Sequence, residues 1–280
     1  MTEQDTRDAR RGARADTEAD APDTRSRPPG AQTVERAFDV LRVLRELPGP
    51  ATAADIARRM DLNVSAVHRM ARAMEHAGFL EQDPATRRYR LGTAIAGLNR
   101  ALHHQRRFDL ARPELRRLSE LTSGSAVLAL RDGREALVVA DLPAEWAPDA
   151  WDTRVTNSVP LHASAFGKAL LAWPRPSDEE LAALGPFERF TERTLTTPAR
   201  LRAELDAAVA RGYTVSSREL RPLQLSVAVP ILDEHGGSYL ALGVGTTWTR
   251  NAAARTGAIA RHLQDSARRL RSVLVLDGPR

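Results

Sequence analysis

The sequence has no cysteine among its 280 residues. Disulfide bonds, thiolate catalysis and cysteine-based zinc sites are therefore excluded. No apolar run approaches the roughly 18 residues that a membrane-spanning helix needs, and the N-terminus lacks the apolar segment of a secretion signal. We therefore expect a soluble protein that stays in the cytoplasm and has no membrane partner.

Lysine is almost absent, because Lys168 is the single lysine among the 41 basic residues. The net charge of +5 permits a polyanionic partner without requiring one. Hydrophobic residues make up 42% of the chain, which is enough for buried cores, and the length predicts about two domains. Residues 1–30 are different, with seven acids, six arginines and no aliphatic residue larger than alanine after Met1. We predict that this segment is a disordered tail.

Residues 52–91 are typical of a helix, a sharp turn, a second helix and a short hairpin. Thr52 can cap the first helix together with Asp55, three residues later. A break in the helical spacing follows, and either Asn63 or Ser65 can cap the second helix. The second helix has apolar residues at helical spacing, namely Val67, Met70, Ala71, Met74 and Ala77.

Gly78 supplies the C-terminal stop of the second helix. Two short alternating runs follow at 79–81 and 88–91, joined by a turn that contains proline, so they predict a two-stranded wing. A further helix at 33–47 would pack its apolar face on this unit. The order of these elements is that of a winged helix-turn-helix domain, which we place at 31–92.

The second helix leaves several side chains on the face that does not pack, and such side chains can enter a DNA major groove. They are Ser65, Ala66, His68, Arg69 and Arg72. At the tip of the wing, Arg87 and Arg88 could contact phosphates or enter a minor groove. Any one of these arginines could equally be a solvated surface residue. Their combination with the order of helices and wing predicts binding to double-stranded DNA.

Residues 93–108 are predicted to form a linker helix. It carries three arginines and no acid, and its narrow apolar stripe consists of Ile95, Leu98 and Leu102. A stripe of this kind favours pairing with a second copy of the chain, and the alternative is docking on its own chain. His103 and His104 are adjacent, so they point to different sides of a helix and make a poor metal pair.

Residues 109–280 show the mixed pattern of an α+β domain. Helices are predicted at 113–121, 166–173, 197–211 and 251–274, and strands at 126–131, 135–140, 213–216, 225–231 and 239–245. Asp132 and Gly133 are a strong hairpin signal between the first two strands. Residues 143–158 are predicted to be a polar loop. A largely antiparallel sheet grouped with helices is typical of a sensor domain.

The chain resembles the IclR family of bacterial transcriptional regulators over about 33–275. The winged helix is shared by many families. More specific is the series formed by the run 159–172, the Arg211-Gly-Tyr sequence, Glu219 and the run 226–231. The resemblance implies an N-terminal winged helix-turn-helix, a linker helix and a C-terminal GAF-like α/β effector-binding domain. It also implies homodimers or dimers of dimers and a small-molecule effector that changes operator binding. Since the two-fold symmetry of a dimer is mirrored in its DNA site, we expect a palindromic operator.

The resemblance further implies where the effector binds. Ala165 and Phe166 would lie at the backbone-amide end of the pocket, and His162 would lie beside it as a hydrogen-bonded structural residue or as a ligand contact. The last strands would contribute Ser216, Ser226, Gly243 and Gly245. At these four positions relatives often carry an acid, a cysteine and two hydroxyl residues.

These departures predict a wider and less charged pocket, since glycine leaves out side-chain volume. We therefore expect an effector that is larger or more hydrophobic than a short-chain acid. Leu223, which replaces a glycine of the family, could instead fill the space together with Phe166. A close backbone approach at the glycines is the other alternative.

An enzyme would need a nucleophile with a base, a carboxylate pair or a metal cluster. His162 and Ser164 make no triad, and the sequence has no G-x-S-x-G motif. Gly167 and Lys168 lack the preceding glycine and the following hydroxyl residue of a phosphate loop, so Lys168 is expected to be solvated or paired with an acid. We predict no catalytic residue, no metal and no cofactor. The alternative is a small-molecule-binding or catalytic α/β domain with a vestigial helix-turn-helix.

Overall fold

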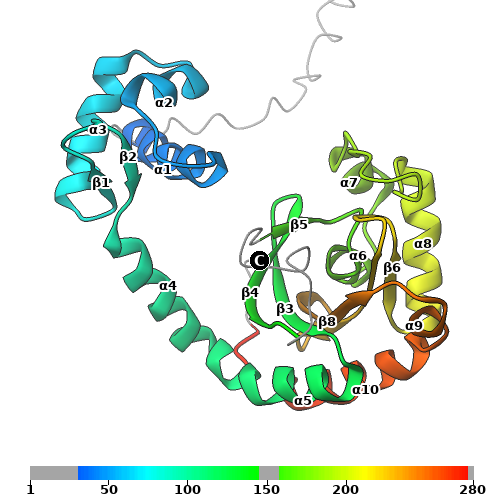
Figure 1. Cartoon of the computed structure of the whole chain (residues 1–280). Helices are drawn as coiled ribbons and strands as arrows, with labels where there is room; N and C mark the ends of the chain where they lie inside the picture. The colour runs from blue at the N-terminus through cyan, green and yellow to red at the C-terminus, as the bar shows by residue number, and fades with distance from the viewer. Residues whose placement is uncertain (1–30, 145–157, 277–280) are drawn as a thin grey trace, which may run out of the picture. The chain divides into compact units, whose positions relative to one another are not determined.

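The computed structural model describes residues 31–144 and 158–276, and the chain divides into two compact units between Ala96 and Gly97. The first unit contains α1 (Ala31–Glu46), α2 (Ala53–Met60), α3 (Val64–His76), β1 (Leu80–Gln82) and β2 (Tyr89–Leu91) (Figure 1). The division falls inside α4 (Thr93–Arg106). No helix among the described residues is both long and apolar enough to span a membrane.

Side-chain caps fix where α2 and α3 begin. The hydroxyl of Thr52 accepts from the N–H of Asp55, and the Asp55 carboxylate accepts from the N–H of Thr52, which confirms the predicted capping box. At α3, the side chain of Asn63 accepts from the N–H of Ala66. The Ser65 hydroxyl donates to the Asn63 side chain instead of capping the helix, so Asn63 and not Ser65 is the N-cap of α3.

The three helices and the wing share one hydrophobic core. Its buried residues include Val40, Ile56, Val67, Met70, Ala71, Met74, Leu80 and Tyr89. β1 and β2 pair antiparallel, with Leu80 opposite Leu91. Tyr89 also exchanges two backbone hydrogen bonds with Ala51, of 2.7 and 3.0 Å. The wing is therefore attached to the segment that precedes α2.

The second unit is built on a six-stranded antiparallel sheet with the order β5-β4-β3-β8-β7-β6. Its strands are β3 (Ser125–Asp132), β4 (Glu135–Leu142), β5 (Ser158–Pro160), β6 (Thr214–Ser217), β7 (Gln224–Leu232) and β8 (Ser238–Thr247). Its helices are η2 (Phe108–Ala111), α5 (Arg112–Thr122), α6 (Ala165–Ala172), α7 (Asp178–Ala183), α8 (Pro198–Arg211), α9 (Arg250–Ala254) and α10 (Thr256–Arg271). The α+β prediction is confirmed.

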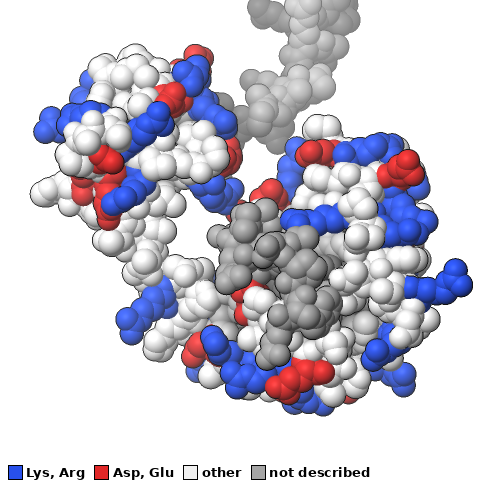
Figure 2. Space-filling model, in the orientation of Figure 1, with Lys and Arg blue, Asp and Glu red and all other residues white. Residues whose placement is uncertain are grey.

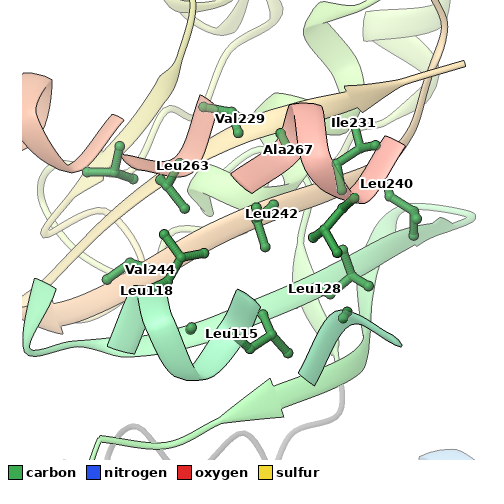
Figure 3. Close-up of a cluster of buried hydrophobic side chains, with 14 of the residues drawn as sticks. Leu115, Leu118, Leu128, Val229, Ile231, Leu240, Leu242, Val244, Leu263 and Ala267 are labelled. Carbon is green, nitrogen blue, oxygen red and sulfur yellow. The ribbon is translucent and has the colours of Figure 1, made fainter. Parts of the chain in front are cut away.

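The sheet separates two hydrophobic cores, because alternate residues of a strand point to opposite faces. On one face α5 and α10 pack against the sheet, and Figure 3 shows residues of this core, among them Leu118, Leu128, Leu242 and Leu263. On the other face α6 packs directly on the sheet, and α7 and α8 belong to the same core. This second face carries the residues that were predicted to bind an effector.

Several predicted elements need correction. The closing helix at 251–274 is in fact two helices, since Arg255 leaves helical geometry with φ −95° and ψ 3°. The linker helix predicted at 93–108 ends at Arg106, because Arg107 is left-handed with φ 58° and Phe108 is buried in the second unit. β5 and α7 were not predicted. The predicted tail and residues 145–157 of the predicted loop lie outside the described residues.

Candidate nucleic-acid interface and ligand site

The outer face of α3 carries the side chains that were predicted to reach a DNA groove. Ser65, Arg69 and Arg72 are exposed, and neither arginine has an ion-pair partner within the described part of the chain. Ala66 and His68 are half-buried. The Nδ1 atom of His68 lies 3.4 Å from the hydroxyl of Tyr89, so this histidine faces the wing and is less available for a DNA contact than predicted.

The wing presents two arginines in different situations. Arg87 is exposed and has a left-handed backbone with φ 57°. Arg88 is exposed as well, but its guanidinium donates to the carbonyl oxygen of Pro50 at 2.9 Å. Arg88 is therefore partly held by the segment before α2. Figure 2 shows basic side chains over the surface of the first unit, with acidic ones among them.

The helix α4 has no buried residue at all, which is unusual for a helix with an apolar stripe. Leu98 is 56% exposed and Leu102 is 37% exposed, while Ile95 is half-buried. His103 touches the ring of Phe108 edge-on. Among the described residues there is no group of three or more side chains that could hold a metal ion.

The N-terminus of α6 forms one wall of the predicted ligand site. The Ser164 hydroxyl caps the helix by accepting from the N–H of Gly167 at 3.0 Å, and it donates to the carbonyl oxygen of Pro160. Ala165 and Phe166 follow in the first turn and are buried. First-turn N–H groups have no acceptor within their own helix, and the helix dipole favours an anion there.

A row of small residues crosses the sheet beneath this helix. Ser216, Ser226, Gly245 and Ser125 lie opposite one another on β6, β7, β8 and β3. The row shares a face with Ala228 and Val127, which pack in the α6 core, so it faces α6. The Ser216 hydroxyl donates to the carbonyl oxygen of Ala163 at 2.8 Å. Three predicted residues are therefore brought together, and Ser125 is a fourth that the sequence did not indicate.

Gly243 does not open space as the sequence had suggested. A Cβ atom added there would lie 2.6 Å from Cε1 of Phe166 and 2.6 Å from the carbonyl oxygen of Val227. The prediction of a wider pocket at this position is wrong, because Phe166 occupies the volume that glycine leaves. Leu223 takes no part in this, since it is 69% exposed. The alternative expectation, that glycine is needed here because the backbone of a neighbouring strand comes close, is the one that the structure supports at Gly243.

His162 lies beside this region and is buried. Its Nε2 atom is 2.9 Å from the carbonyl oxygen of Glu188, and its ring centre lies 5.2 Å from that of Phe187 and 5.9 Å from that of Phe190. Burial lowers the pKa of His162. A hydrogen-bonded, mainly neutral imidazole fits the structural role that was one of the two expectations for this residue.

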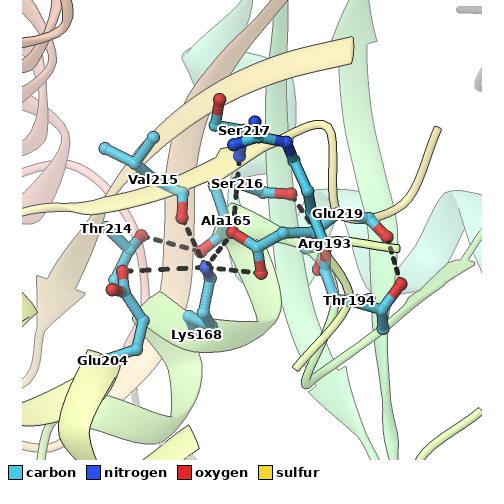
Figure 4. Close-up of polar contacts among 12 residues, drawn as sticks. Ala165, Lys168, Arg193, Thr194, Glu204, Thr214, Val215, Ser216, Ser217 and Glu219 are labelled. Carbon is cyan, nitrogen blue, oxygen red and sulfur yellow. Dashed lines mark hydrogen bonds and ion pairs between the residues drawn. The ribbon is translucent and has the colours of Figure 1, made fainter. Parts of the chain in front are cut away.

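Lys168 forms a buried ionic network that spacing along the sequence could not reveal (Figure 4). Its side chain is fully buried, and Nζ lies 2.8 and 3.0 Å from the two carboxylate oxygens of Glu219. Nζ also donates to the carbonyl oxygen of Val215 and lies 3.7 Å from Glu204. Burial raises the pKa of Glu219. Pairing with an acid was one of the two expectations for Lys168, and the partner comes from a distant segment.

The two units together define a DNA-binding protein with a winged helix-turn-helix and a separate α/β ligand-binding domain. Residues 33–84 match the IclR helix-turn-helix domain, and residues 99–272 match the domain described as "Bacterial transcriptional regulator IclR C-terminal". The chain therefore belongs to the IclR family of bacterial transcriptional regulators.

Characterised relatives and solved structures agree with this assignment. The chain is 33% identical to the HTH-type transcriptional regulator BhcR of Paracoccus denitrificans, covering 86% of each chain. It is 28% identical to the HTH-type transcriptional repressor AllR of Escherichia coli, covering 88% of this chain and 92% of AllR. An IclR regulator from Alicyclobacillus acidocaldarius superposes with a TM-score of 0.73 at 25% identity, covering 86% of this chain and 98% of that one.

A further structural neighbour contains a ligand. It is an IclR homologue from Microbacterium hydrocarbonoxydans complexed with 4-hydroxybenzoate. Its TM-score is 0.66 at 26% identity, covering 85% of this chain and 99% of that one.

Proposed function

We propose that this regulator binds a palindromic operator as a dimer or dimer of dimers, and that a small organic acid bound on the α6 face of the second unit changes its affinity for DNA. The single observation that best supports the proposed DNA binding is the exposed pair Arg69 and Arg72, which lies on the outer face of α3 in a complete winged helix-turn-helix. We assign the protein no catalytic activity and propose that it acts in the cytoplasm, where a bacterial chromosome is found.

For DNA binding, α3 is the proposed reading helix. Residues near the start of a recognition helix contact base edges, and Ser65, Ala66 and Arg69 are placed for this role. His68 and Arg72 would follow along the groove, and Arg87 and Arg88 of the wing would contact phosphates. Arginine suits both tasks because its guanidinium donates in a fork to base edges or phosphate oxygens.

For dimerisation, α4 offers the apolar stripe. Leu98 and Leu102 are exposed on a helix that buries nothing within the described part of its own chain. Burying such side chains against a second copy gives roughly 25 cal/mol for each Å² of apolar surface. A two-fold axis between two α4 helices would relate the two α3 helices by the same symmetry, so the DNA half-sites should form a dyad.

For the effector, the α6 N-terminus and the serine row are the proposed binding walls. The first-turn N–H groups of Ala165 and Phe166, which have no acceptor within their own helix, suit a carboxylate, and the hydroxyls of Ser216 and Ser226 would lie opposite them. Gly245 belongs to the same row, Gly243 allows Phe166 to pack closely, and His162 supports the wall. The neighbour that holds 4-hydroxybenzoate supports the choice of an organic acid as ligand.

The test is a gel-shift titration with the DNA upstream of the protein's own gene, repeated with 4-hydroxybenzoate. We expect a specific complex whose affinity changes when the acid is added. Absence of a specific complex on that DNA, combined with acid binding in calorimetry, would favour the alternative of a ligand-binding domain with a vestigial helix-turn-helix.

A further inference from the structure

An apolar side chain is exposed at the start of α3. Val64 is the first residue of the helix, directly after the N-cap Asn63, and it is 43% exposed. Val67 and Ala71 lie three and seven residues further on, which places them on the same side of the helix, and both are fully buried. Helical spacing alone would therefore bury Val64 as well. Its exposure shows that this side chain lies beyond the end of the core that Val67 and Ala71 join.

The direction of the Val64 side chain follows from helix geometry. In an α-helix each Cα–Cβ bond tilts toward the N-terminus, so the side chain of the first residue projects ahead of the helix end. A recognition helix contacts base edges in the major groove with its N-terminal residues. Val64 therefore stands at the end of α3 that would meet the bases in the proposed complex.

The polar side chains beside Val64 are engaged with each other. The Oδ1 atom of Asn63 accepts from the N–H of Ala66 at 2.8 Å and from the hydroxyl of Ser65 at 2.9 Å. A serine hydroxyl has a single proton, so in this arrangement Ser65 can approach a base only as an acceptor. The first turn of α3 thus presents the isopropyl group of valine next to a hydroxyl whose proton is already used.

An isopropyl group can distinguish one base from the other three. In the major groove, thymine alone among the four bases carries a methyl group, at C5. Valine offers no hydrogen bond, so against a polar base edge it would exclude water from donors and acceptors without replacing it, which is costly. Against the thymine methyl group it would instead remove apolar surface from water on both sides of the contact.

We propose that Val64 is a specificity-determining residue of the DNA interface, and that it reads one thymine in each half-site through contact with the C5-methyl group. This inference rests on the proposed function, since it assumes that α3 enters the major groove. It adds an apolar contact to the polar contacts proposed for Arg69 and Arg72. Because a dimer would bring two copies of Val64, the thymines should occur at dyad-related positions.

The first test removes the methyl group from the DNA and leaves the protein unchanged. The site of the full chain on the DNA upstream of its own gene is located by footprinting. Dyad-related thymines of that site are then replaced in turn by uracil, which lacks only the methyl group. At one such pair, uracil should weaken binding roughly fourfold for each half-site, the effect of withdrawing one methyl-sized group from an apolar contact. Equal affinity for every uracil-containing site would overturn the proposal.

A variant then assigns the methyl group to its residue. Val64→Ala should bind the thymine and uracil forms of the site equally, because the shortened side chain no longer reaches C5. Val209 of α8 is equally exposed, at 43%, and belongs to the second unit, so Val209→Ala should keep the wild-type preference for thymine. If Val64→Ala is as sensitive to uracil as the wild type, another residue reads the methyl group and the proposal fails.

The outcomes separate this inference from the function on which it rests. A specific complex that is indifferent to every thymine methyl group overturns the role of Val64 and leaves the proposed DNA binding intact. The absence of any specific complex on that DNA overturns both.

Discussion

Lys168 and Glu219 form an ion pair in the interior of the second unit, with Nζ 2.8 Å from Oε1 (Figure 4). The pair joins α6 to the segment between β6 and β7. The Glu219 carbonyl oxygen also accepts a hydrogen bond from the Thr194 hydroxyl at 2.7 Å, so a third segment is attached at the same point. The pair therefore fixes the position of α6, one wall of the proposed effector site, relative to these two segments.

Removal of one partner should be costly, because it leaves a buried unpaired charge. We expect Lys168→Met to lower the free energy of unfolding by about 3–5 kcal/mol, measured by urea denaturation. The double variant Lys168→Met with Glu219→Leu should recover most of this loss, since both charges are then absent. A double variant as unstable as the single one would show that the carboxylate is not the source of the loss.

The α3 arginines should determine the strength and salt dependence of DNA binding. Arg69→Ala or Arg72→Ala should cost about 1–3 kcal/mol if a base contact is lost. Loss of a phosphate contact should instead reduce the slope of log K against log salt by about 0.9. Filter binding at several salt concentrations measures both effects. Arg175→Ala, at an exposed arginine of the second unit, is the control. Wild-type affinity in the Arg69 and Arg72 double variant would exclude α3 as the reading helix.

The α4 stripe should hold the proposed dimer together. Replacing Leu98 and Leu102 by Asp would place charges in the pairing surface, and the dimer should dissociate or weaken in sedimentation experiments. His104→Asp adds a charge to the same helix at an exposed position on the side opposite the stripe, and it should leave the proposed dimer intact. If both variants sediment like the wild type, the copies associate through another surface.

The Thr52 capping box should make the first unit sensitive to acid. Hydrogen bonds from the Thr52 side chain, then from its backbone, and then from Arg58 lower the pKa of Asp55 from 3.8 to about 2. A folded pKa below the unfolded one stabilises the protein above the unfolded pKa, and this contribution is lost as pH falls. Thermal unfolding should therefore show a loss between pH 3.8 and about 2. Asp55→Asn should lack this component, and an unchanged acid profile in that variant would contradict the assignment.

Local features of the fold could be predicted from the sequence, because their causes lie within a few residues. The Thr52 cap and the Asp132-Gly133 hairpin are of this kind, and Gly133 has the expected positive φ of 59°. The short helix α7 also had a local signal, the Ser177 and Glu180 capping box, but six residues give too little apolar periodicity to identify a helix.

Contacts between distant segments could not be predicted in this way. Lys168 meets Glu219 and Phe166 fills the space beside Gly243 only because the sheet brings these segments together. The sequence shows that a side chain is missing at a glycine, but it does not show what occupies the space.

Gly243 provides the sharpest test of the packing between α6 and the sheet. Gly243→Ala would place a Cβ atom 2.6 Å from both the Phe166 ring and the Val227 carbonyl oxygen, so the variant should lose about 1–3 kcal/mol of stability. Adding Phe166→Leu should restore only part of this, because the carbonyl oxygen belongs to the backbone and cannot move away. Gly97→Ala is the matched control, since nothing lies within 4 Å of its added Cβ and α4 should gain about 0.5–1 kcal/mol. Thermal and urea unfolding measure all three variants. A Gly243→Ala chain as stable as the wild type would mean that space is available there, and it would restore the expectation of a wide pocket.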